Sequence, residues 1–159
     1  MALPQFVLYE EEYKQIGTVI DKLVKEAYAK AIFLVDKNGQ LIAGSGETQN
    51  IDTTSLASLT AGNIAATGGL AKLIGEKEFS ILFHEGEKDH IHLSIIGAKI
   101  ILVIIFDERS SLGLVRLRAK KASGELENIF SNLIKKMESG QAASPFSEIT
   151  EDDIENLFS

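Results

Sequence analysis

The sequence predicts an α/β sandwich in which a five-stranded antiparallel sheet lies between helices. Three observations support this fold class. Apolar residues recur at helical spacing in three segments, five short apolar runs have the length of strands, and neighbouring runs are joined by hairpin-length connections that favour antiparallel pairing. The expected order is α-β-β-α-β-β-β-α, followed by a C-terminal helical tail.

The first half of the chain begins with a predicted helix over 9–29, where apolar residues lie three and four positions apart. Two short apolar runs follow at 31–35 and 40–43. Asn38 and Gly39 lie between them, and this pair tolerates the positive φ that a tight turn needs. The segment is therefore expected to form a β-hairpin.

The second half of the chain contains a predicted middle helix, which begins near Asp52 and ends before Gly75, because these residues suit an N-cap and a C′ position. Three strands are expected next, at 78–85, 89–97 and 99–107. The run from Ile100 to Phe106 is apolar at every position, which is typical of a central strand covered on both faces. A long helix over 112–139 is expected to close the fold.

Beyond residue 139 the composition changes. Residues 1–139 are predicted to form one domain, 140–146 a flexible linker, and 147–159 an acidic amphipathic helix. The tail carries five carboxylates and no basic residue between Glu148 and Glu155, while its apolar residues fall on one helical face. This pattern favours a segment that docks on a partner, and the alternative is a tail that only adds solubility.

The composition excludes several classes of protein. The chain has no cysteine, so disulfides, thiolate zinc sites and a cysteine nucleophile are ruled out. A net charge of −7 disfavours binding to nucleic acid. No run of about 18 apolar residues is available to span a bilayer. We therefore expect a cytoplasmic protein.

The middle helix is unusual because it has no charged side chain between Asp52 and Lys72, although 25% of the chain is charged. At 100° per residue its large and small residues fall on opposite arcs. The large residues form the arc expected to face the sheet: Leu56, Leu59, Leu70, Leu73 and Ile74. The small residues, with one lysine, form the opposite arc: Ala61, Ala65, Gly68, Gly69 and Lys72.

A face of small, uncharged residues lets the backbone of a partner approach closely, so we predict that this second arc binds another protein. The adjacent residues Thr60, Ile64 and Ala71 are predicted to contact the same helix of a second subunit. The alternative is structural: Gly62, Gly68 and Gly69 would pack closely against the sheet or bend the helix.

Residues able to carry out chemistry are few. Lys72 follows two glycines but is not followed by Ser or Thr, so no phosphate-binding loop is complete. The histidines at 84, 90 and 92 are better interpreted as strand residues than as metal ligands. Arg109 is the most accessible candidate for an arginine finger, although surface ion pairing is the favoured interpretation. Neither a cofactor nor a metal is expected.

Several segments, at 33–41, 48–67 and 111–118, resemble the roadblock superfamily, and the segment 144–159 is similar to the tail of its bacterial GTPase regulators. The resemblance implies a roadblock/profilin-like fold and a homodimer joined through the middle helix and an adjacent strand. It also implies that the dimer binds the GTP form of the Ras-like GTPase MglA and stimulates hydrolysis by reordering the GTPase's own catalytic groups. The implied biology is bacterial cell polarity and gliding motility.

By the same resemblance, the tail would contact the GTPase through five apolar residues: Phe146, Ile149, Ile154, Leu157 and Phe158. The chain would then be a regulator without chemistry of its own, a GTPase activator recruited to a cell pole. One alternative is a roadblock scaffold that binds a GTPase without activating it. The other is a small-ligand sensor, which would need a pocket lined by polar groups.

Overall fold

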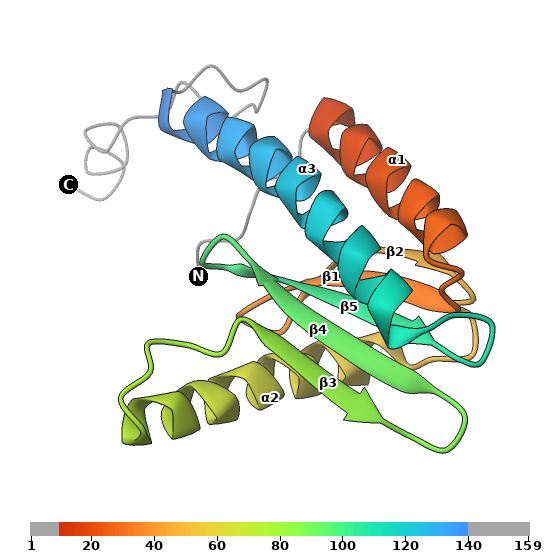
Figure 1. The fold of residues 1–159 in the computed structure, drawn as a ribbon. Coiled ribbons are helices and arrows are strands. Elements are labelled where there is room, and N and C mark those ends of the chain that lie inside the picture. The colour runs from red at the N-terminus through yellow and green to blue at the C-terminus, as the bar shows by residue number, and fades with distance from the viewer. Residues whose placement is uncertain (1–9, 140–159) are drawn as a thin grey trace.

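The structure, a computed structural model, describes residues 10–139 and shows the expected order of elements (Figure 1). The elements are α1 (Glu10–Glu26), β1 (Ala31–Asp36), β2 (Leu41–Gly46), α2 (Thr53–Leu73), β3 (Ile81–Glu85), β4 (His90–Ile96), β5 (Ile100–Phe106) and α3 (Leu112–Ser139). The predicted linker at 140–146 and the predicted tail helix at 147–159 lie outside the described residues.

The five strands form one sheet in the order β2-β1-β5-β4-β3, with every neighbouring pair antiparallel. The helices α1 and α3 lie together on one face, and α2 lies on the other face (Figure 1). The predicted sandwich is therefore confirmed. Its two edges are β2 and β3, so β3 has a strand partner on one side only.

The β1–β2 hairpin turns at the Asn-Gly pair, as predicted. Gly39 has a φ of 90°, a conformation that favours glycine. The carboxylate oxygen Oδ1 of Asp36 accepts hydrogen bonds from the backbone N–H groups of Asn38 at 2.9 Å and Gln40 at 3.0 Å. At the point where the chain reverses, this side-chain acceptor adds to the backbone bonds from the N–H of Asp36 to the carbonyl of Gln40 and from the N–H of Gly39 to the carbonyl of Asp36.

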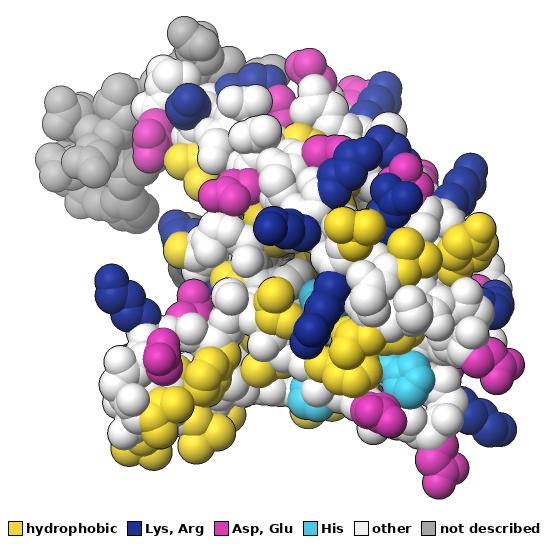
Figure 2. Space-filling model, in the orientation of Figure 1, with side chains coloured by type: hydrophobic (Ala, Val, Ile, Leu, Met, Phe, Trp, Pro, Cys, Tyr) yellow, Lys and Arg dark blue, Asp and Glu magenta, His cyan; other side chains and the backbone are white. Residues whose placement is uncertain are grey.

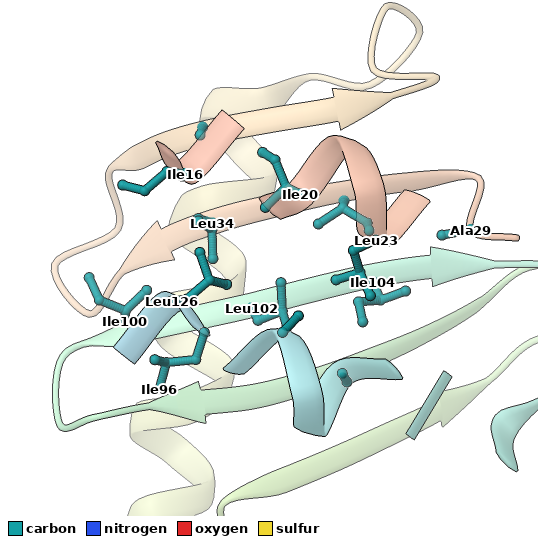
Figure 3. Packing of buried hydrophobic residues seen from close by; sticks show 14 of the residues in the cluster. Ile16, Ile20, Leu23, Ala29, Leu34, Ile96, Ile100, Leu102, Ile104 and Leu126 are labelled. Atoms are coloured by element: carbon teal, nitrogen blue, oxygen red, sulfur yellow. The ribbon is translucent and has the colours of Figure 1, made fainter. Parts of the chain in front are cut away.

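Two hydrophobic clusters lie on the two faces of the sheet, because β1 and β5 are buried along their whole length. Figure 3 shows the larger cluster, where Ile16 and Ile20 of α1 and Leu126 of α3 lie over Leu34 and Leu102. The smaller cluster lies under α2 and consists of Ala31, Phe33, Val35, Ala57, Ile64, Leu93, Ile101, Val103 and Ile105. One face of the sheet is therefore covered by two helices, and the opposite face of the same sheet is covered by α2 alone.

The first helix ends earlier than the periodicity predicts, at Glu26 instead of residue 29. Tyr28 has a φ of 52°, and the N–H of Ala29 bonds the carbonyl of Val24 at 3.0 Å. A left-handed residue closes the helix and turns the chain into β1. The buried Ala27 follows the apolar spacing of the helix without being part of it.

Two glycines should respond in opposite ways to replacement by alanine. Gly17 is helical with nothing within 4 Å of an added Cβ, so Gly17→Ala should raise the free energy of unfolding by about 0.5–1 kcal/mol. Gly46 has a φ of 86°, and an added Cβ would lie 2.6 Å from the carbonyl oxygen of Lys30. Gly46→Ala should therefore destabilise the fold by about 1–3 kcal/mol.

Urea unfolding of the two variants and the parent chain measures both effects. A Gly46→Ala variant as stable as the parent would contradict the backbone conformation described for the end of β2.

Candidate functional site

The middle helix α2 is rotated differently from the sequence prediction. The residues that face the sheet are Ala57, Thr60, Ile64 and Ala71. The prediction that the arc of large residues faces the sheet is wrong for Leu59, Leu70, Leu73 and Ile74, which are exposed, while Leu56 is partly buried. The reason is steric: the strands already supply bulky side chains such as Phe33 and Val103, and small helix residues fill the remaining space.

This rotation also corrects the residues predicted for the dimer interface. The exposed fractions of Thr60, Ile64 and Ala71 are 8%, 7% and 0%. Their side chains lie against the sheet of their own chain, so they have almost no surface to offer to a second subunit. The residues available for that role lie elsewhere on the helix.

The small residues of α2 lie on one side of the buried arc, and we call Ala61, Ala65, Gly68, Gly69 and Lys72 the small flank. Ala65, Gly69 and Lys72 are exposed, and the other two are half-buried. The small flank lies on the side of the β1–β2 hairpin, since a Cβ added to Gly39 would be 3.7 Å from the Cβ of Ala61.

The glycines of α2 are not required by packing within the chain. Among residues 10–139, a Cβ added to Gly62, Gly68 or Gly69 would find no atom within 4 Å beyond the adjacent residues and the nearby backbone of α2 itself. The alternative that these glycines allow close packing on the sheet is therefore wrong, while the alternative that they bend the helix stays a prediction. Each glycine costs the helix roughly 1 kcal/mol relative to alanine, and packing among the described residues does not account for that cost.

The large residues of α2 lie on the other side of the buried arc and form an exposed apolar surface, which we call the leucine flank. Leu59, Leu70, Leu73 and Ile74 have exposed fractions of 73%, 60%, 82% and 69%. Figure 2 shows hydrophobic side chains gathered over the C-terminal end of α2. An exposed patch of this kind marks a surface for protein contact.

The leucine flank lies on the side of the edge strand β3. Asn63 Nδ2 donates a hydrogen bond to His84 Nε2 over 3.1 Å, which connects α2 to β3. Thr67 Oγ1 in turn donates to the carbonyl oxygen of Asn63 at 2.7 Å. The exposed apolar residues and an unpaired strand edge are thus held next to each other.

Both ends of α2 have the caps that the sequence predicts. The carboxylate of Asp52 accepts hydrogen bonds from the hydroxyl of Ser55 at 2.7 Å and from its N–H at 3.2 Å, which lowers the pKa of Asp52. At the other end Gly75 has a φ of 81°, and its N–H bonds the carbonyl of Lys72. The N–H of Glu76 bonds the carbonyl of Ala71, so the helix stops within one turn.

Arg109, the candidate arginine finger, is held by two carboxylates. Its guanidinium contacts Asp107 at 2.9 Å and 3.0 Å and Glu47 at 3.0 Å. These bonds, first those to Asp107, raise the pKa of Arg109 above its usual value. The contacts match the surface ion pairing favoured from the sequence. Arg109 would have to break its bonds to Asp107 and Glu47 before it could enter the active site of another protein.

The histidines at 84, 90 and 92 lie on the strands β3 and β4, as the sequence suggests. Within residues 10–139 no three His, Cys, Asp or Glu side chains are arranged to hold a metal ion. His90 and His92 share one face of β4, but His92 is only 1% exposed and its two ring nitrogens have no hydrogen-bond partner among the described residues. None of the helices in this range combines the length and the apolar character that spanning a membrane requires.

Burial lowers the pKa of His92, and the nearby positive charge of Arg116 lowers it further. Below about pH 6.5 the unfolded chain binds a proton at this side chain more readily than the folded chain does. The free energy of unfolding should therefore fall as the pH drops from about 7.5 to about 5.

In a His92→Leu variant this contribution is removed, so its stability should decline less over the same pH range. Urea unfolding at a series of pH values compares the two proteins. Parallel stability curves for parent and variant would show that His92 is not held neutral in the folded state.

Known proteins are similar to this chain both within one family domain and over about four fifths of its length. The Roadblock/LC7 domain model matches residues 15–106. Myxococcus xanthus MglB is 66% identical, with a TM-score of 0.76, covering 80% of this chain and 96% of that one. The gliding protein MglB from Thermus thermophilus is 34% identical, with a TM-score of 0.77, covering 82% and 99%.

A further MglB structure, described as having a tetrameric arrangement, is 32% identical with a TM-score of 0.78, and the match covers 83% of this chain and 99% of that one. No curated protein sequence is significantly similar to the chain. The sequence resemblance to the roadblock superfamily is confirmed by these matches.

Proposed function

Because the chain belongs to the Roadblock/LC7 family, we propose that it is a homodimeric GTPase-activating regulator of a Ras-like small GTPase of the MglA type. The dimer binds the GTP state and reorders the GTPase's own catalytic groups. The observation that carries this proposal is the surface of α2, which is free of charge up to Lys72 and open on both sides. Similarity to MglB supports the choice of partner.

The leucine flank is the surface proposed to join two subunits. It exposes four large apolar side chains beside the edge strand β3. Fully burying one such side chain is worth about 1.5–3 kcal/mol, and an edge strand offers free backbone groups to a second copy. One MglB relative is described as having a tetrameric arrangement, which supports the proposal that copies of this chain associate with one another.

Replacing Leu70 or Leu73 by glutamate should convert the dimer to monomer, because a carboxylate would have to be buried at the subunit contact. Sedimentation equilibrium measures the mass of each variant. The matched control is Leu117→Glu, since Leu117 is 63% exposed on α3, on the other face of the sheet. Dimers of unchanged affinity in both leucine-flank variants would contradict the proposed interface.

The small flank is the surface proposed to contact the GTPase. Apart from Lys72, its residues have short, uncharged side chains, so the partner's backbone can come close along most of this surface. Since the two flanks lie on different sides of α2, subunit contact through the leucine flank leaves the small flank accessible. The two α2 helices of a dimer would then present both small flanks to one GTPase.

The activation is proposed to occur without an inserted arginine. Arg109, the most accessible candidate, is bound by Asp107 and Glu47. The regulator must then bind the hydrolysis-competent conformation of the GTPase more tightly than the resting one, because only such a difference in affinity shifts the population. The catalytic groups would all belong to the GTPase.

The proposed tail contacts, at Phe146, Ile149, Ile154, Leu157 and Phe158, would adjust this effect from a separate surface of the GTPase. They lie outside the described residues and rest on the sequence pattern and on the resemblance to the roadblock superfamily. In the cell we propose a cytoplasmic protein that is recruited to a pole and acts in polarity and motility. The description of the Thermus thermophilus relative as a gliding protein supports the link to motility.

Ala65→Arg or Gly69→Arg should weaken GTPase binding by roughly 100-fold or more, because an unpaired charge would be buried against the partner. The readout is single-turnover GTP hydrolysis by a purified MglA-type GTPase, titrated with the dimer. The parent dimer should accelerate hydrolysis, and both variants should not at the same concentration. Gly124→Arg is the matched control, because Gly124 is an exposed helical glycine on α3 with open space around it.

The same titration separates the proposal from its alternative. If the GTPase binds the dimer but hydrolyses GTP at its basal rate, the chain is a roadblock scaffold and not an activator. If both arginine variants bind and activate as well as the parent, the small flank is not the contact surface.

A further inference from the structure

A cavity lies on the α3 side of the sheet, between the second half of α3 and the turn that joins β4 to β5. Its volume is about 140 Å³. Four large apolar side chains line it: Ile96, Ile100, Phe130 and Ile134. The rest of the lining is Gly97, Ala98 and Ser131, with one lysine and one glutamate, Lys99 and Glu127.

The lining determines the kind of occupant. A site for a small metabolite would need several convergent polar groups, and this lining is dominated by isoleucine and phenylalanine. An apolar side chain gains free energy on entering such a space, whereas a charged group loses its hydration there. The occupant should therefore be an uncharged, apolar segment.

We propose that residues 2–8 of this chain dock in the cavity, with Phe6 as the side chain that fills it. The segment reads Ala-Leu-Pro-Gln-Phe-Val-Leu and contains no charged residue. Pro4 favours an extended conformation around it, which suits a strap laid across a surface. The proposal concerns the regulator's own domain and does not depend on its GTPase.

The start of α1 lies close enough to the cavity. Lys136, near the end of α3, bonds Glu12 Oε2 at 2.5 Å and lies 3.6 Å from Glu11 Oε2, so the first turn of α1 is fixed beside α3. Ile134 and Phe130 precede Lys136 by two and six residues, or about 3 and 9 Å along the helix axis. Nine extended residues reach about 30 Å, which is enough to cross α3.

A buried oxygen at the same corner needs a donor. Glu12 is 3% exposed, and its Oε1 has no hydrogen-bond partner among the described residues. A glutamate at the third position of a helix commonly accepts from a backbone N–H at the helix start. Under this proposal, a backbone N–H from the residues that lead into α1 supplies the donor.

The acidic tail is the competing occupant, because it follows α3. It carries five carboxylates between Glu148 and Glu155. Lys99 and Glu127 line the cavity together and leave it without net charge, so nothing there offsets the loss of hydration of the tail's carboxylates, whereas residues 2–8 carry no charged side chain. Charge therefore favours residues 2–8 over the tail.

A paramagnetic label tests the proposal in the full chain. The sequence has no cysteine, so Ala98→Cys creates a single labelling site at the rim of the cavity. Amide resonances of residues 2–8 should broaden, and those of 147–159 should not. A label at Ser58→Cys, exposed on α2 on the other face of the sheet, is the control and should leave residues 2–8 sharp.

Three outcomes would overturn the proposal: broadening of 147–159 in place of 2–8, broadening of neither, or broadening of 2–8 only between differently labelled copies in a mixed sample. The first identifies the tail as the occupant, and the last identifies a second copy. Because a label at the rim can disturb docking, thermal unfolding of Phe6→Ala gives a second measurement. Its Tm should fall by about 4 °C or more, while Gln5→Ala should match the parent.

Discussion

The burial of β1 and β5 on both faces is the constraint on which the rest of the structure depends. Each of their side chains is buried, so both faces of the sheet must be covered. Two helices cover one face with large side chains, and α2 alone covers the other through Ala57, Thr60, Ile64 and Ala71. A single helix seated on small residues lies near the strands and keeps both of its sides open. The candidate site is a consequence of this asymmetric covering.

The sequence predicts the elements well, because the signals for them are local. The Asn-Gly turn, the cap at Asp52 and the stop at Gly75 each act within a few residues of the chain. The apolar run of β5 likewise predicts its burial on both faces. The early end of α1 at Glu26 was not predictable from spacing, because Ala27 continues the apolar pattern after the helix has ended.

The rotation of α2 could not be predicted, because the helix has no charged side to mark its solvent face. The usual expectation, that the largest apolar residues are buried, assumes that the helix fills the core. Here the strands fill most of it, with side chains such as Phe33, and the buried residues of the helix are Ala57, Thr60, Ile64 and Ala71. The residues of the small flank are exposed or half-buried, whereas Thr60, Ile64 and Ala71 are too buried to make the subunit contact predicted for them.

The hydrogen bond from Asn63 to His84 has a consequence for how such a regulator could respond to what it binds. It is the direct side-chain bond between α2 and the strand at the sheet's border, within the part of the chain that the structure describes. A protein that binds the small flank and displaces α2 would also displace β3, because Asn63 and His84 connect the two elements. Linked binding equilibria are reciprocal, so subunit contact at β3 would change the affinity of α2 for the bound protein by the same factor. The affinity of the subunits for each other and the affinity for the bound protein would then change by the same factor through the bond between Asn63 and His84.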